Sequence, residues 1–238
     1  ITLQTYAGKK KPRRKRVPKS KAISVNKGLK NWGAKKIISY LKTKPLTIPT
    51  GISIGSTNQA YDSLKDQILD VVTCFSLFEQ SGLKHSYYEL NISCPNTFGG
   101  EPFSIPSHLE ALLTALDKLN LSKPIYVKFP IDQSWKESEV LLDIIASHSP
   151  VGVILGNLTK DHTNPAVDES ERDIWNSSRG NLSGKPTWDR SNTLVKKTRQ
   201  KYKNRFTIIG TGGIFSGEDA AYKLDQGADL VQLITGMI

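Results

Sequence analysis

Acidic side chains are absent from the first 61 residues, since the first carboxylate of the chain belongs to Asp62. The same stretch carries 15 Lys or Arg, whereas residues 62–238 carry 18 basic and 22 acidic residues. The basicity is concentrated at residues 9–16, KKKPRRKR. Such a run could bind nucleic acid or an anionic membrane surface, or lie in a solvated loop. We expect a solvated basic loop at residues 8–22.

Long apolar runs and cysteines are also scarce. No run of 18 apolar residues is present, which argues against a membrane span. Two cysteines cannot form a disulfide framework and favour a reducing, cytosolic compartment. Cys74 lies in an apolar helical stretch and is predicted to be a buried core thiol. Metal-ligand spacings, phosphate loops and nucleophile elbows are lacking, and the four histidines are predicted to lie at the surface or in loops: His85, His108, His148 and His162.

Short apolar runs alternate with stretches of helical periodicity. The runs predict buried strands at 45–55, 86–93, 124–129, 151–156, 206–211 and 229–235. The periodic stretches predict helices at 58–81, 107–120, 136–148, 190–203 and 217–226. Two buried helix faces are expected, one with Leu109, Leu112, Leu113 and Leu116, the other with Val140, Leu141, Ile144 and Ile145.

Strands that alternate with helices predict an α/β protein with a parallel sheet covered by helices. An open doubly wound sheet and a closed (β/α)8 barrel both fit this pattern, and six strands are two short of a barrel. Polar residues cluster where the strands end, at Gly55-Ser56, 91–97, Lys128, Gly156-Asn157, 210–213 and Thr235-Gly236. Both architectures bind ligands at the carboxyl ends of their strands. The chemistry is therefore expected there.

The segment 91–100, NISCPNTFGG, places amides on both sides of the thiol of Cys94. The amides could orient a planar ligand, and a thiol can act as a base where its surroundings favour the thiolate. The alternative is a turn with an incidental thiol. Lys128 lies in an otherwise apolar strand, where it needs an anionic partner or a route to solvent.

Glycines follow one strand at 210–213, GTGG, and precede the next at Gly227. Glycines at such positions let backbone N–H groups approach a phosphate, and the start of the following helix favours its charge. Thr235-Gly236 ends the next strand beside them. Together they predict a phosphate site at the last two strands.

Taken in order, the motifs NISCPN, VKFP, ILGNLT, LSGKP, IIGTGGIFSGEDA and GADLVQLITG resemble those of dihydroorotate dehydrogenases. The opening ITLQTYAGKKKPRRKR is similar to the Pro-Arg-rich stretch that follows the second barrel strand of this family. The resemblance implies one FMN-binding (β/α)8 TIM-barrel domain over residues 1–238, incomplete at the N-terminus because its first strands are missing, and lacking the last helix. It also explains the basic run without nucleic acid.

The reaction implied is oxidation of (S)-dihydroorotate to orotate in pyrimidine (UMP) synthesis. A base takes a proton from C5 while hydride passes from C6 to FMN. Carried over by motif, Cys94 is the base, and the substrate residues are Asn31, Asn91, Asn96 and Asn157. The cofactor residues are Asn91, Lys128, Gly156, Asn157, Gly184, Gly212, Gly213, Ile234 and Thr235. Residues 26–31, NKGLKN, resemble the substrate-binding strip Asn-x-x-Gly-[Phe/Leu]-x-Asn of this family. They have one residue fewer between Asn26 and Gly28, which favours Asn31 over Asn26.

The resemblance is mixed as to subclass. A cysteine base is similar to the soluble class 1 enzymes, whereas LSGKP and the Pro-Arg opening are similar to the quinone-linked class 2, which we favour. Ser53 and Leu158 depart from the Asn and Thr usual in the family. The expected acceptor is a quinone, with fumarate, or NAD through a partner subunit, as alternatives. A homodimer fits the resemblance, as does a cytoplasmic protein or one peripheral on the inner face of the membrane.

Three rival interpretations stay open. A related flavin barrel of the dihydropyrimidine dehydrogenase type also uses a cysteine base, although Asn96 after Pro95 favours dihydroorotate. A nucleic-acid-binding protein would use the basic segment and would not need polar strand ends. A degenerate barrel would keep the fold without the activity.

Overall fold

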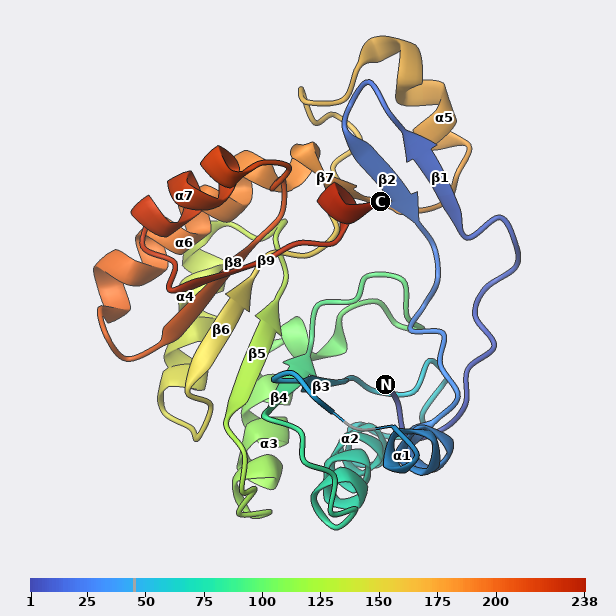
Figure 1. The fold of residues 1–238 in the computed structure, drawn as a ribbon, viewed down its shortest axis with the longest axis vertical. Helices are drawn as coiled ribbons and strands as arrows, with labels where there is room; N and C mark the ends of the chain where they lie inside the picture. The colour runs from blue at the N-terminus through green and yellow to red at the C-terminus, as the bar shows by residue number, and fades with distance from the viewer. Residues whose placement is uncertain (45) are drawn as a thin grey trace.

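A curled, six-stranded parallel sheet forms the centre of the computed structural model, which describes residues 1–44 and 46–238 (Figure 1). The strand order is β3-β4-β5-β6-β8-β9, and every neighbouring pair is parallel. The strands are β3 (Gly51–Ile54), β4 (Tyr87–Asn91), β5 (Ile125–Phe129), β6 (Gly152–Leu155), β8 (Thr207–Thr211) and β9 (Leu230–Gln232). Each lies within a predicted strand, and the parallel α/β prediction is confirmed.

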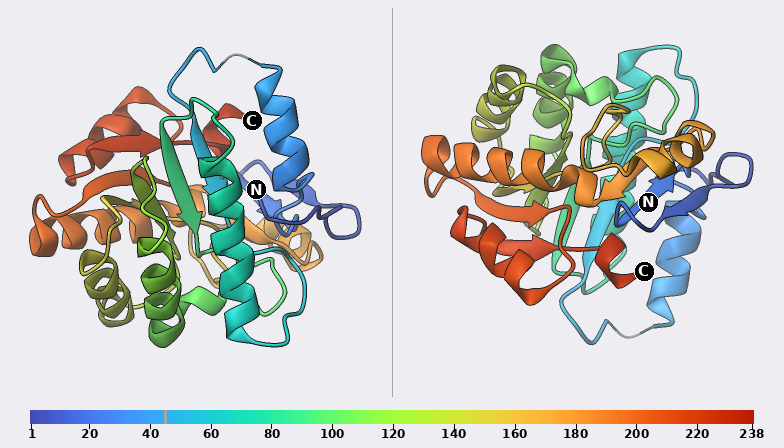
Figure 2. Two further views of the ribbon diagram at one scale, coloured as in Figure 1. Left: turned by 90° about the horizontal axis from the view of Figure 1, so that it is seen from below. Right: turned by 90° about the horizontal axis from the view of Figure 1, so that it is seen from above.

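Helices cover the outer face of this sheet (Figures 1 and 2). They are α2 (Leu64–Glu79), α3 (Pro106–Asp117), α4 (Trp135–Ala146), α6 (Trp188–Tyr202) and α7 (Gly217–Asp225). Ser63, Ser134 and Ser216 cap three of them, each accepting the backbone N–H three residues further on. The result is an α/β fold of the TIM-barrel type.

The main core lies between the sheet and these helices. Leu109, Leu112, Leu113 and Leu116 of α3 are all buried, and so is Cys74 of α2, as predicted. The face predicted for α4 is partly wrong, because Val140 is 44% exposed while Leu142 is fully buried. A helical stripe of apolar residues is wider than the strip that contacts the sheet, so a residue at its flank can face solvent.

Some helices and strands begin or end at other residues than predicted, because a cap or a turn overrides the apolar pattern. The predicted helix 58–81 begins at Leu64 because Ser63 adopts an extended conformation and caps it. The predicted strand 45–55 is reduced to β3, and its first residue, Pro45, lies outside the described residues. The strand predicted at 229–235 ends at Gln232.

A second, antiparallel sheet lies above the carboxyl ends of the parallel strands (Figure 1). It consists of β1 (Arg14–Val17), β2 (Ala22–Val25) and β7 (Asn181–Gly184), in the order β1-β2-β7. Residues 8–22 were expected to form a loop, and this expectation is wrong for β1 and Ala22. The sequence pattern does not predict these strands, because they are only four residues long and the first is mostly charged.

The segment between β6 and β7 packs against the β1–β2 hairpin. It carries the short helix α5 (Arg172–Asn176), which was not predicted, and neither was α1 (Ala34–Lys42) beside α2. Trp175 and Val167 of this segment form a small core with Val17, Ala22 and Leu182. The buried carboxylate of Glu171 accepts the backbone N–H groups of Lys19 (3.0 Å) and Ser20 (2.8 Å) at the hairpin turn.

The histidines were expected at the surface or in loops, and His85 lies in the loop between α2 and β4, although it is buried there. This ring is 4% exposed and packs edge-on against Tyr88, with 4.6 Å between ring centroids. His148 follows α4 and contacts two carboxylates of α3, Asp117 at 2.7 Å and Glu110 at 3.1 Å.

We expect Glu171→Gln to loosen the hairpin. Both carboxylate oxygens accept backbone N–H groups of the turn, whereas a glutamine side chain has only one acceptor oxygen. Limited trypsin digestion should then cleave about tenfold faster at residues 19–21, an effect of about 1.4 kcal/mol on local opening. Glu169→Gln, on an exposed neighbour, serves as the control. Equal cleavage rates for the unchanged protein and Glu171→Gln would contradict this role.

His148 should contribute a pH-dependent stability. Partial burial lowers its pKa, but hydrogen bonds to Asp117 and Glu110 outweigh burial and raise the pKa above the ordinary value. The contribution is therefore complete below the pKa of the unfolded chain and is lost as pH rises through the higher pKa of the folded protein. His148→Gln should lower the free energy of unfolding by at most about 1 kcal/mol at pH 5.5, and by less at pH 8. Urea unfolding at both pH values measures this, with His108→Gln as control; a pH-independent difference would refute it.

Candidate active site

The loop that follows β4 lies at the carboxyl edge of the parallel sheet, under the antiparallel sheet. Asn96, which is buried, links these two layers: its Nδ2 donates to the carbonyl oxygen of Val25 (2.9 Å) and its Oδ1 accepts from Asn181 Nδ2 (3.0 Å). Both polar atoms of this predicted substrate residue are therefore engaged within the protein. These two hydrogen bonds hold the loop after β4 next to β2 and β7.

Asn157, directly after β6 and Gly156, points toward the same loop. Its Nδ2 donates to the carbonyl oxygen of Ser93 (2.8 Å) and to Ser93 Oγ (2.6 Å), while its Oδ1 accepts from the N–H of Leu158. Asn91 Oδ1 in turn accepts from the backbone N–H of Ser93 at 3.2 Å. The two predicted amides thus meet at Ser93, directly before Cys94.

Cys94 is partly exposed and has no disulfide partner. Burial of its sulfur raises the pKa of the thiol, while the charges of Lys9 and Lys128 act in the opposite direction. The thiol is therefore protonated at neutral pH in this state. A thiolate base needs additional stabilisation, which an ordered cationic or hydrogen-bonding ligand environment can supply.

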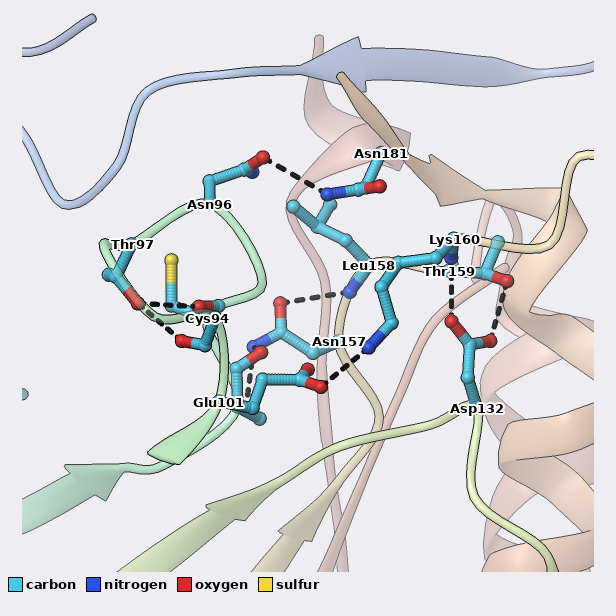
Figure 3. A network of polar contacts seen from close by, with 12 residues as sticks. Cys94, Asn96, Thr97, Glu101, Asp132, Asn157, Leu158, Thr159, Lys160 and Asn181 are labelled. Atoms are coloured by element: carbon cyan, nitrogen blue, oxygen red, sulfur yellow. Dashed lines mark hydrogen bonds and ion pairs between the residues drawn. The ribbon is translucent and has the colours of Figure 1, made fainter. Parts of the chain in front are cut away.

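An ion pair joins the end of the Cys94 loop to the segment after β6 (Figure 3). Lys160 Nζ lies 2.7 Å from Glu101 Oε2, and the Glu101 side chain is only 13% exposed. The backbone N–H of Lys160 and the hydroxyl of Thr159 both donate to Asp132, at 2.6 Å each. The loops after β4, β5 and β6 are therefore tied to one another beside Cys94.

Lys128 lies next to Asn91 in the register of β4 and β5. Its Nζ donates to Oε1 of Gln232 on β9 at 2.9 Å, across the concave side of the curled sheet. The partner in this state is neutral, so the ammonium keeps an uncompensated charge that can face an anionic ligand.

A cleft of about 290 Å³ lies between the antiparallel sheet and the ends of β5, β6 and β8. Its walls include eight of the nine predicted cofactor residues, namely Lys128, Gly156, Asn157, Gly184, Gly212, Gly213, Ile234 and Thr235. Asn91 is not among them, nor are Asn31, Cys94 and Asn96. Apolar side chains, such as Ile23 and Val25 of β2 and Ile214 of the loop after β8, provide much of the remaining wall.

The glycine loop after β8 adopts a conformation that side chains disfavour. Gly212 and Gly213 have φ of 106° and 74°, and a Cβ on Gly213 would come within 2.8 Å of Trp188. Glycine therefore lets the backbone close over Trp188 and face the cleft.

Two cations of the cleft were not predicted as site residues. Arg14 and Lys27 line it together with Lys128, and none of the described lining residues is an aspartate or glutamate. Partial burial, together with the nearby charges of Arg14 and Lys30, lowers the pKa of Lys27. The cleft therefore fits a ligand that is flat and largely apolar but carries an anionic group. Nothing in the sequence singles out Arg14 or Lys27 among the 15 Lys and Arg of residues 1–61.

Of the two candidates in the strip 26–31, the structure separates Asn31 from the cleft. Asn31 Nδ2 donates to Thr2 Oγ1 and to the carbonyl oxygen of Leu29, and its Oδ1 accepts from the N–H of Gly33, each at 2.7 Å. The side chain braces the N-terminal segment. The buried Oδ1 of Asn26, in contrast, has no hydrogen-bond partner among the described residues. Neither asparagine lines the cleft.

The described residues contain no group of three or more His, Cys, Asp or Glu side chains arranged to hold a metal ion. Within the same residues, no helix combines the length and apolar character that crossing a membrane requires.

Sequence comparison identifies the family. The model of the dihydroorotate dehydrogenase family matches residues 1–238. A dihydroorotate dehydrogenase (quinone) of Crocosphaera subtropica is 31% identical over 245 residues, covering 100% of this chain and 63% of that protein. A dihydroorotate dehydrogenase (quinone) of Nostoc punctiforme is also 31% identical, and the match covers 64% of that protein. The chain thus spans just under two thirds of the length of these curated relatives.

Solved structures share the fold. A crystal structure of the dihydroorotate dehydrogenase of Eimeria tenella in complex with ferulenol superimposes with a TM-score of 0.86 at 22% identity, covering 100% of this chain and 68% of that one. A ligand-free structure of the same enzyme gives 0.85 at 23% identity. Because the family model matches the whole of residues 1–238, the chain belongs to the dihydroorotate dehydrogenase family.

Proposed function

We propose that this chain forms the flavin- and substrate-binding part of an enzyme that oxidises dihydroorotate to orotate. The observation that carries the proposal is the cleft at the carboxyl edge, where predicted cofactor residues on or directly after five strands of the two sheets converge beside the Cys94 loop. Family membership supplies the substrate class. The names of the relatives support a quinone as acceptor.

FMN fits the cleft by its chemistry. The apolar walls suit a flat ring system, and the three cations with the glycine loop suit a phosphate and the charge that a reduced flavin carries. Lys128 would face the ring, and Gly212 and Gly213 would hold the phosphate side. When bound, the flavin would accept the hydride that leaves C6 of the substrate.

The residues of this chain would orient the substrate and move its proton. Asn91, Asn96 and Asn157 surround Cys94 and already fix its loop through hydrogen bonds. Cys94 Sγ would accept the proton from C5. Asn31 stays in the proposed substrate set, and Asn26, whose buried Oδ1 has no partner among the described residues, is an additional candidate.

The proposal extends to the parts of the barrel that the chain does not contain. The relatives are longer, and β3 and β9 are the outer strands of the described sheet, where further strands of a closed (β/α)8 barrel would pair. Ile1 already pairs with the edge of β3, because its N-terminus donates to the carbonyl oxygen of Ser53 (2.7 Å) and its carbonyl oxygen accepts from the N–H of Gly55 (3.0 Å). A cytoplasmic location, or one at the inner face of a membrane, and a homodimer are parts of the same proposal.

The direct test is anaerobic addition of dihydroorotate to the purified full-length protein. Loss of the visible absorption of a bound flavin would support both cofactor and substrate. A protein that binds flavin and keeps its colour would contradict the substrate assignment and favour a related dihydropyrimidine-oxidising barrel.

We expect Cys94→Ser to retain flavin but to slow its reduction by dihydroorotate at least about 100-fold at pH 7, because a hydroxyl is a far weaker base. In the unchanged protein, reduction should accelerate as pH rises toward the raised pKa of the thiol. Stopped-flow spectroscopy measures both effects. Cys74→Ala, which removes the buried core thiol, is the matched control and should leave the rate unchanged. Identical pH profiles for Cys94→Ser and the unchanged protein would refute the assignment.

Lys160→Met should loosen the Cys94 loop without unfolding the protein. Lys160 is 49% exposed, so the loss of its ion pair with Glu101 should cost less than about 1 kcal/mol of stability. The looser loop should raise the KM for dihydroorotate several-fold, and Glu101→Gln should add little to Lys160→Met in a double-mutant cycle. Lys201→Met breaks ion pairs between outer helices and is the control. Additive effects of the two substitutions on KM would show that the pair does not act as a unit.

A further inference from the structure

Lys223 of α7 is a fully buried cation that lies behind the glycine loop rather than in the cleft. Its Nζ donates to Asn192 Oδ1 at 2.7 Å and to Ser191 Oγ at 3.0 Å, and both of these partners are neutral. Asp219, one turn earlier on α7, accepts the N–H of Phe215 and influences Lys223 only from a distance. A buried ammonium with neutral partners is costly, so its charge needs a compensating role.

Ser191 connects this charge to the cleft. Its Oγ lies 2.5 Å from the carbonyl oxygen of Thr211 and 3.1 Å from that of Leu155. These two carbonyl groups directly precede Gly212 and Gly156, which line the cleft. By accepting from Lys223, Ser191 directs its own proton toward these carbonyls. The ends of β6 and β8 are therefore fixed from behind, and their carbonyl oxygens are held away from an incoming anion.

Trp188 provides a second connection. Its ring centroid lies 4.9 Å from Lys223 Nζ, and its backbone and side chain form the surface on which Gly213 rests. Gly210 contacts the stem of the lysine, because a Cβ there would come within 2.5 Å of Lys223 Cδ. The lysine thus packs behind the whole segment from Gly210 to Gly213. Burial lowers its pKa to about 8, so the group is still mostly charged at neutral pH.

We propose that Lys223 is a positioning residue for the anion-binding loop: through Ser191 and Trp188 it fixes the segment 211–213 and contributes, from behind, positive charge for a phosphate group in the cleft. This inference rests on the proposed flavin-binding function. It predicts that the lysine affects the phosphate of the ligand and not its ring.

FMN and riboflavin differ only in the phosphate, so their dissociation constants separate the two effects. In the full-length apoprotein, Lys223→Met should weaken FMN binding about tenfold, as expected for the loss of a charged hydrogen-bond donor. Riboflavin binding should change less than about twofold by the same reasoning. Lys223→Arg should keep part of the preference for FMN, and Lys196→Met, at an exposed site on α6, should have no effect.

Ser191→Ala is the second variant, because it leaves the lysine in place and removes the hydroxyl that connects the lysine to the carbonyl groups of Thr211 and Leu155. It should also weaken FMN binding more than riboflavin binding, and it decides the question alone if Lys223→Met does not fold. Equal losses for both ligands, or no loss, would overturn the proposal while leaving flavin binding intact. If the unchanged protein binds neither flavin, the proposed function fails instead. Thermal stabilisation by inorganic phosphate is then the probe: its loss in Lys223→Met supports the role of the lysine, and its persistence refutes it.

Discussion

The antiparallel pairing of β2 with β7 is the interaction on which the candidate site depends. It joins Ala22–Val25 to Asn181–Gly184, segments about 160 residues apart, and places a second sheet above the carboxyl edge of the parallel sheet. The cleft exists only because this pairing forms its upper wall. Asn96 reinforces the arrangement, since it contacts Val25 on one side and Asn181 on the other.

The cations of the cleft also come from both parts of the fold. The parallel strands contribute one cation to the cleft, Lys128, while the hairpin region brings Arg14 and Lys27. Two cations of the basic N-terminal quarter thus line the cleft. The buried Glu171 anchors the turn of this hairpin to the segment after β6, because its carboxylate accepts the backbone N–H groups of Lys19 and Ser20.

The parallel half of the fold could be predicted because apolar runs of strand length alternate with long amphipathic helices, a pattern that local sequence carries by itself. Gly156 and Gly212 could be named because they directly follow predicted parallel strands, whereas Gly184, in β7, could be named only from the LSGKP motif. The hairpin could not, since its strands are short, charged and stabilised by partners far away in the chain. Asn26 and Asn31 are a related case: the sequence shows two similar amides, and only packing shows that Asn31 is engaged with Thr2 and Gly33.

The sequence by itself therefore determined the parallel α/β layers, the edge at which ligands bind and the family to which the motifs belong. Tertiary structure decided which polar groups face the cleft and which are engaged in holding the chain together, because a side chain's role depends on neighbours brought near by folding. Lys223 shows this most clearly. Its surroundings in the sequence are those of an ordinary helical lysine, yet the packing of α7 on α6 buries it behind the loop that faces the cleft.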